Sequence, residues 1–226
     1  MKIKTLVIPA ILVFVISCGK TKTPPPVTQA ATYLTISAGS SWTFRQIDSS
    51  VTTPTTVNYT LTSTSRDTAI NSKSYHIYNQ SNSGLLYLSV VGNNYYEFDS
   101  LPAVFGAGVF ENLYLKENAA VGTSWTQNQS VNISNLPFPI PVTLTYNIAG
   151  TGMTMVLNNI TYTNVIHVVT TVTSSLIPGS GLSSNINSYY AEKYGLIQSS
   201  TKINLDYMGL VQNVNLFVQL TGSTLL

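Results

Sequence analysis

Apolar and polar residues alternate with a period of two along most of the chain after residue 33. In the segment SWTFRQID (41–48), Trp42 and Phe44 alternate with Thr43 and Arg45. Successive side chains of a strand point to opposite faces, so this period indicates half-buried β-strands. The same pattern returns in the ranges 74–80, 84–91, 94–100, 112–118, 141–150, 164–175, 187–195, 195–205 and 213–222.

Turn residues separate these ranges at short intervals, as at Gly92-Asn93-Asn94 and Asn158-Asn159. Gly150-Thr151-Gly152 also predicts a hairpin turn between two strands. The best helical candidate, LPAVFGAGVFENL (101–113), contains two glycines, which favours a loop or a short turn of helix over a regular helix. About a dozen strands are expected. We therefore predict an all-β fold: a single antiparallel, strongly curved sheet, a half-barrel or barrel-like, with two related halves.

Both tryptophans of the chain lie in similar small-residue segments, AGSSWTF (38–44) and VGTSWTQ (121–127). The repeat predicts that Trp42 and Trp125 occupy equivalent positions in two halves, 33–118 and 119–221, of one domain spanning 33–226. Two small independent sandwiches are the alternative. Each Trp is either a core anchor or part of an aromatic platform for a ligand.

The first 17 residues have the features of a secretory signal peptide. Lys2 and Lys4 precede an apolar run of 11 residues, Leu6 to Ile16, which is shorter than the about 20 residues that span a bilayer. The following Cys18, the only cysteine, completes a sequence that resembles the lipobox of bacterial lipoproteins. That resemblance implies cleavage before Cys18 and its lipidation. The range 18–32, with three consecutive prolines, is expected to form an extended tether.

The charge pattern argues against nucleic acid as a partner. The chain has 10 basic and 8 acidic residues, but four of the lysines, at positions 2, 4, 20 and 22, precede residue 33. The domain therefore holds six basic and eight acidic residues, without the basic cluster that a phosphate backbone requires.

Three segments resemble lipoproteins of unknown function from the Bacteroidota: YLTISAGSSWTFRQ (33–46), VGTSWTQ (121–127) and YYAEKYGLIQSSTK (189–202). The resemblance implies a highly curved antiparallel sheet, distantly similar to the half-barrels of periplasmic lipoprotein carriers. Those carriers lay helices across the concave face, and this sequence has no strong helical segment. The resemblance carries over no catalytic residue.

No set of residues suited to catalysis or metal binding is found. The motif Gly-x-Ser-x-Gly is absent, and the two histidines, His76 and His167, lack the partners of a zinc site. Glu97 and Asp99 share a strand face at a spacing that a glycosidase or calcium site uses, but a solvated strand face shows the same spacing. We expect no enzymatic activity, no cofactor and no metal.

The expected function is that of a non-catalytic envelope lipoprotein that binds an apolar ligand or a lipid. The low charge favours it, as do two segments with apolar side chains. NLPFPIPV (135–142) would expose Leu136, Phe138 and Ile140, and SSLIPGSGLSS (174–184) adds Leu176, Ile177 and Leu182. The candidates for the ligand site are Trp42, Trp125, Phe138 and Ile140. A structural or adhesive lipoprotein without a small-molecule ligand is the alternative.

Membrane contact is expected through the lipid on Cys18, at the outer membrane. The periplasmic side is favoured over the cell surface, because no acid-rich segment follows the cysteine. Asp67-Thr68-Ala69 and Asp99-Ser100-Leu101 resemble the O-glycosylation acceptor of Bacteroidota, which makes Thr68 and Ser100 candidate sites.

Overall fold

The computed structural model describes residues 33–100, 109–132 and 138–226, and these form twelve strands in one antiparallel sheet. The signal peptide, Cys18 and the tether lie outside the described residues. The strands are β1 (Ser41–Asp48), β2 (Thr55–Ile70), β3 (Lys73–Gln80), β4 (Gly84–Val91), β5 (Asn94–Ser100), β6 (Val109–Lys116), β7 (Ser124–Val131), β8 (Ile140–Leu157), β9 (Ile160–Ser174), β10 (Leu182–Ala191), β11 (Gly195–Tyr207) and β12 (Leu210–Thr224).

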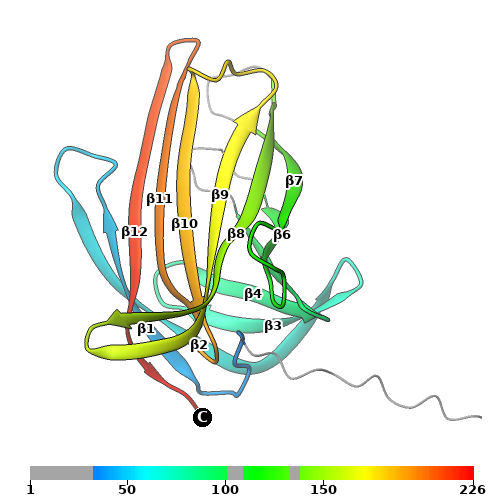
Figure 1. Cartoon of the computed structure of the whole chain (residues 1–226), viewed down its shortest axis with the longest axis vertical. Helices are drawn as coiled ribbons and strands as arrows, with labels where there is room; N and C mark the ends of the chain where they lie inside the picture. The colour runs from blue at the N-terminus through cyan, green and yellow to red at the C-terminus, as the bar shows by residue number, and fades with distance from the viewer. Residues whose placement is uncertain (1–32, 101–108, 133–137) are drawn as a thin grey trace, which may run out of the picture.

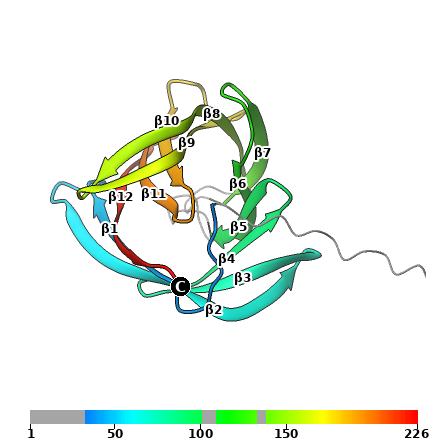
Figure 2. The same cartoon turned by 60° about the horizontal axis from the view of Figure 1, so that its bottom comes forward.

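The sheet curves into a nearly closed barrel (Figures 1 and 2). Its strand order is β6-β5-β4-β3-β2-β1-β12-β11-β10-β9-β8-β7, so β1 and β12 join the two ends of the chain and the edges are β6 and β7. Because all twelve strands belong to one sheet, the alternative of two independent sandwiches is wrong. The predicted all-β, strongly curved antiparallel sheet is confirmed.

Side chains bridge the seam between the two edge strands. The Gln127 side chain accepts a hydrogen bond from Leu113 N at 3.0 Å and donates one to Glu111 O at 3.1 Å. The Trp125 indole donates to Leu113 O at 2.8 Å. The amide of Gln127 thus takes the place of a backbone peptide, and it satisfies the edge of β6 where no regular ladder continues.

The two glycine-tryptophan segments have the same backbone geometry. Gly39 and Gly122 both have φ of 89°, a conformation that favours glycine. Gly39 N donates to Ser63 O, and Gly122 N donates to Ile148 O. Trp42 and Trp125 are each the second residue of the strand that follows, β1 and β7. The similar sequences therefore encode the same turn and the same start of a strand. Each segment precedes a run of six strands, β1 to β6 and β7 to β12.

Two local predictions from the sequence are wrong. We interpreted Gly150-Thr151-Gly152 as a hairpin turn, but it lies inside β8, where register shifts absorb the extra residues. The hairpin is at Asn158-Asn159, both with positive φ. In the helical candidate 101–113, the residues from 109 onward belong to β6, and 101–108 lie outside the described residues.

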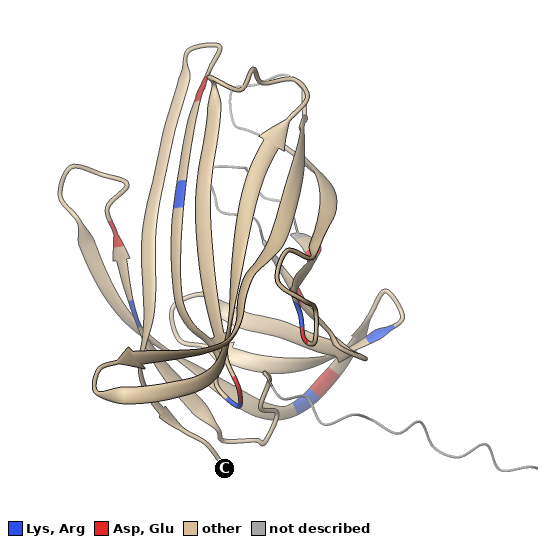
Figure 3. Ribbon diagram, in the orientation of Figure 1, with Lys and Arg blue, Asp and Glu red and all other residues tan. Residues whose placement is uncertain are grey.

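Apolar side chains line the concave side of the sheet, and the alternation seen in the sequence determines which ones. Trp42 and Phe44 are buried while Thr43 and Arg45 are exposed. Charges are few, and the strands from β7 to β12 carry only Lys202 and Asp206 (Figure 3). None of the described residues forms a helix with the length and hydropathy needed to traverse a bilayer.

Candidate ligand-binding site

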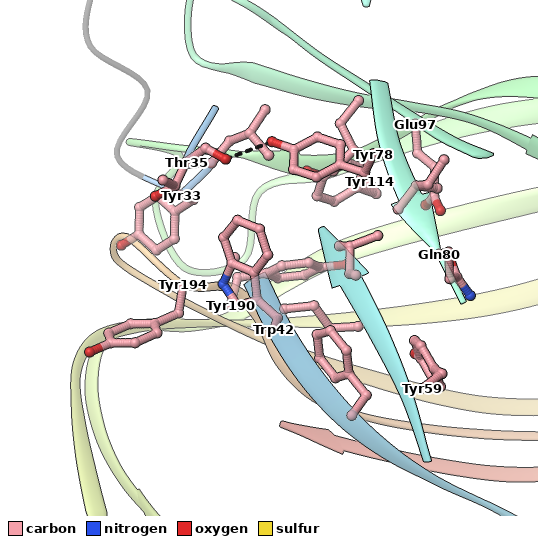
Figure 4. A pocket seen from close by; sticks show the side chains of 17 residues that line it. Tyr33, Thr35, Trp42, Tyr59, Tyr78, Gln80, Glu97, Tyr114, Tyr190 and Tyr194 are labelled. Carbon is pink, nitrogen blue, oxygen red and sulfur yellow. Dashed lines mark hydrogen bonds between the residues drawn. The ribbon is translucent and has the colours of Figure 1, made fainter. Parts of the chain in front are cut away.

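The interior of the barrel contains a cavity of about 270 Å³ with a largely aromatic wall (Figure 4). The wall draws on the segment before β1, on strands β1–β6 and on the β10–β11 region. Leucines complete the wall between the rings. Its aromatic members are Tyr33, Trp42, Phe44, Tyr59, Tyr78, Tyr114, Tyr190 and Tyr194.

A second cavity, also of about 270 Å³, lies against the first. Its wall combines aliphatic side chains, Val131, Val142, Leu144, Val172, Ile186 and Ile203, with the neutral polar side chains of Asn112, Thr170, Ser188, Ser199 and Thr201. The two cavities share four lining residues, Glu97, Tyr114, Tyr190 and Leu196. These four form the partition between an aromatic and an aliphatic compartment.

Glu97 is the single charged side chain among the described residues that line these cavities. It lies on β5, opposite Leu88 of β4 and Asn112 of β6. We expected Glu97 and Asp99 on either a solvated strand face or a carboxylate site. The solvated face is wrong for Glu97, because that face of β5 is turned toward the interior. The Asp99 side chain lies outside the described residues.

Burial keeps the phenols of the interior neutral. Desolvation, followed by the charge of Glu97, raises the pKa of Tyr59 to about 12. The same two causes raise the pKa of Tyr146, and desolvation dominates the raised pKa values of Tyr78 and Tyr114. Neutral phenols act as hydrogen-bond donors, as where Tyr78 donates to Thr35 O at 2.7 Å.

The two tryptophans differ in their surroundings. Trp42 lines the first cavity and packs edge-on against Tyr78, with 5.9 Å between ring centroids. Its buried indole N–H has no acceptor within the described part of the chain. Trp125 lines neither cavity; it stacks on Tyr146 and donates across the seam. Only Trp42 therefore belongs to the candidate site.

The other two candidates, Phe138 and Ile140, lie outside both cavities. Ile140 was predicted to be exposed in a proline-rich loop, and this is wrong: it begins β8 and is fully buried in the core. Phe138 is 38% exposed, and it lines neither cavity. In the segment 174–184, Leu176 is exposed, but Ile177 and Leu182 are buried. Leu136 lies outside the described residues.

The structure also brings together three polar residues whose proximity the sequence did not indicate. His76 Nε2 lies 2.9 Å from Ser63 Oγ, and His76 Nδ1 lies 2.6 Å from Asp67 Oδ1. This is the order of groups in a serine-hydrolase triad. Ser63 is only 1% exposed and lines neither cavity. The register shift between Ser63 and Asp67 in β2 places both side chains next to His76. The spacing of these residues in the sequence does not predict such a bulge.

The remaining candidate positions are placed as follows. Thr68 lies in β2 with a half-buried side chain, opposite Tyr75. Ser100 ends β5, and its side chain lies outside the described residues. His167 Nε2 lies 2.9 Å from Asn187 Oδ1, and the His167 ring stacks on Tyr189. Among the described residues, no group of three or more His, Cys, Asp or Glu side chains is arranged to hold a metal ion.

Comparison with known proteins shows the fold. No protein-family model matches the chain, and no curated protein matches it. The chain is similar to the crystal structure of a "putative lipoprotein" from Parabacteroides distasonis. The match covers 87% of this chain and 100% of that chain, with a TM-score of 0.51 and 10% sequence identity. The two proteins therefore share a fold, which extends over nearly the whole described barrel.

Proposed function

We propose that this chain is a non-catalytic, lipid-anchored envelope protein whose barrel interior binds an apolar or lipid-like ligand. The aromatic cavity is the observation that carries the proposal. Protein interiors are normally packed without large voids, and ligand sites begin at about 300 Å³ with mostly apolar walls. Neither cavity reaches that volume alone, but the two adjoining cavities of about 270 Å³ each exceed it together.

The lipid anchor is supported by the sequence before residue 33 and by the fold shared with a protein described as a lipoprotein. We propose attachment through Cys18 at the outer membrane, on the periplasmic side. Replacing Cys18→Ala should release the protein from the membrane fraction. The anchor is contradicted if the Cys18→Ala variant stays in the membrane fraction and the mass of its mature N-terminal peptide differs from that of the wild type only by the Cys-to-Ala change.

The proposal of a non-catalytic protein is supported by the burial of Ser63. A nucleophilic serine must meet its substrate, and the Ser63 hydroxyl is covered and faces neither cavity. The hydrogen bonds of His76 to Ser63 and Asp67 instead span the bulge of β2, where Thr64 Oγ1 also donates to Ile77 O.

Trp42 offers a direct test of ligand binding, because it lines the cavity and Trp125 does not. The neutral probe 1-octanol should change the tryptophan fluorescence of the wild-type domain and of Trp125→Phe in a saturable way. Trp42→Phe, which retains only Trp125, should show little change. Organic extraction of protein purified from its native membrane should also release a bound molecule.

The structural or adhesive alternative draws on the outer surface. Strands β7 to β12 present Ser, Thr, Asn and Gln almost without charge, as at Thr143 and Asn147 of β8. If octanol leaves the fluorescence of Trp42 unchanged and extraction yields no ligand, the binding proposal fails. The structural or adhesive role of this outer surface is then favoured.

A further inference from the structure

Glu97 is the one charged side chain among the described residues that line the two cavities, whose other lining side chains are apolar, phenolic or neutral and polar. Its position bears on which ligands can enter. We propose that Glu97 makes the barrel interior select amphiphiles with a cationic or hydrogen-bond-donating head group and reject anionic lipids such as fatty carboxylates. This inference rests on the proposed function, because it concerns the ligand of the same cavities.

Glu97 is placed so that a ligand in either compartment meets it. It belongs to the partition that the cavities share, together with Tyr114, Tyr190 and Leu196. Its strand neighbours across the sheet are Leu88 and Asn112, which line the first and the second cavity respectively. A head group near the partition therefore lies within reach of the carboxylate from both sides.

The charge of Glu97 acts across the whole interior. It contributes, after desolvation, to the raised pKa values of Tyr59, Tyr146 and Tyr190, which lie on β2, β8 and β10. No Lys or Arg is among the described residues that line the two cavities. The cavities themselves thus supply no cationic group for an anionic head.

Electrostatic interactions in such a site are stronger than in bulk water, because apolar and phenolic side chains surround the half-buried carboxylate of Glu97. Two like charges in an environment of low dielectric repel each other far more than in water, and one of them must then take up a proton or leave. An ammonium head gains attraction from the same carboxylate, and a hydroxyl head donates a hydrogen bond to it. The expected order of affinity is therefore cationic, then neutral, then anionic.

The test uses three probes that differ only in the head group: octylamine, 1-octanol and octanoate. Binding of each probe to the protein is measured near neutral pH by Trp42 fluorescence and by calorimetry. We expect octylamine to bind at least about tenfold more tightly than octanoate, the ratio that a modest Coulomb interaction gives. Glu97→Gln should reduce this ratio to near one while retaining octanol binding.

Asp206→Asn is the matched control, because it removes one exposed carboxylate from the outside of β11 and should leave the order of affinities unchanged. If octanoate binds the wild-type domain as tightly as octylamine, the selectivity of Glu97 is refuted although the cavity binds ligands. This comparison stands even if Glu97→Gln does not fold. If none of the three probes binds, the proposed function itself is refuted.

Discussion

Side chains that bridge β6 and β7 close the barrel, and the contribution of one of them, Gln127, can be measured. Gln127 on β7 makes two hydrogen bonds to the backbone of β6, with Leu113 N and Glu111 O, at 3.0 and 3.1 Å. The two residues of β6 are two positions apart, so the Gln127 amide spans them as a peptide of a neighbouring strand would. Replacing Gln127→Ala removes both bonds and leaves the β-strand itself intact.

The expected loss of stability follows from these two bonds. Each hydrogen bond contributes about 0.5–1.5 kcal/mol net, so Gln127→Ala should lower the free energy of unfolding by about 1–3 kcal/mol. In a domain of this size, each kcal/mol corresponds to about 2–4 °C in Tm. The loss should concentrate at the seam, since Leu113 N then depends on water for a partner.

Denaturant unfolding measures the global change, and amide hydrogen exchange at Leu113 measures the local one. Gln129→Ala is the matched control, because it is the same substitution two residues further along β7. The Gln129 side chain makes no hydrogen bond within the described residues. Equal stability of the two variants, or unchanged exchange protection of the Leu113 amide in Gln127→Ala, would refute the role assigned to Gln127.

Three further predictions concern the turns, the phenols and the buried serine. Gly39→Ala and Gly122→Ala should each destabilise the domain by about 1–2 kcal/mol in denaturant titrations, because both positions need the same positive φ. The Leu226 Cδ1 that an added Cβ at position 39 would meet at 2.9 Å ends an exposed side chain that can move aside. An unchanged unfolding midpoint for either variant would contradict this. The raised pKa of Tyr59, about 12 against an unfolded value near 10, means that its contribution to stability is complete below pH 10 and is lost as the pH rises to about 12. Unfolding free energies measured across that range should decline less for Tyr59→Phe than for wild type; superimposable profiles would refute the assignment. A fluorophosphonate probe should leave Ser63 unlabelled in the folded protein, as read by peptide mass spectrometry, and stoichiometric labelling would overturn the non-catalytic assignment.

The alternation of side chains in the sequence was sufficient to predict an all-β fold with buried Trp42 and Phe44, because a period of two reflects the geometry of a single strand. The repeated glycine-tryptophan segments likewise predicted matching turns, since φ near 89° at Gly39 and Gly122 is a local requirement. By contrast, β2 (Thr55–Ile70) has a Thr- and Ser-rich sequence with little apolar alternation, and only pairing with β1 and β3 identifies it as a strand.

The candidate site was decided by tertiary structure. Periodicity says which residues share a face, but it does not say which face is enclosed or which strand lies opposite. Glu97 therefore looked like a surface residue until the closed sheet placed it beside Tyr190, 93 positions away in the chain. Ile140 looked like an exposed loop residue for the same reason. Barrel closure is a long-range property: it needs Gln127 and Leu113 to meet across two edges, and no local pattern encodes that meeting.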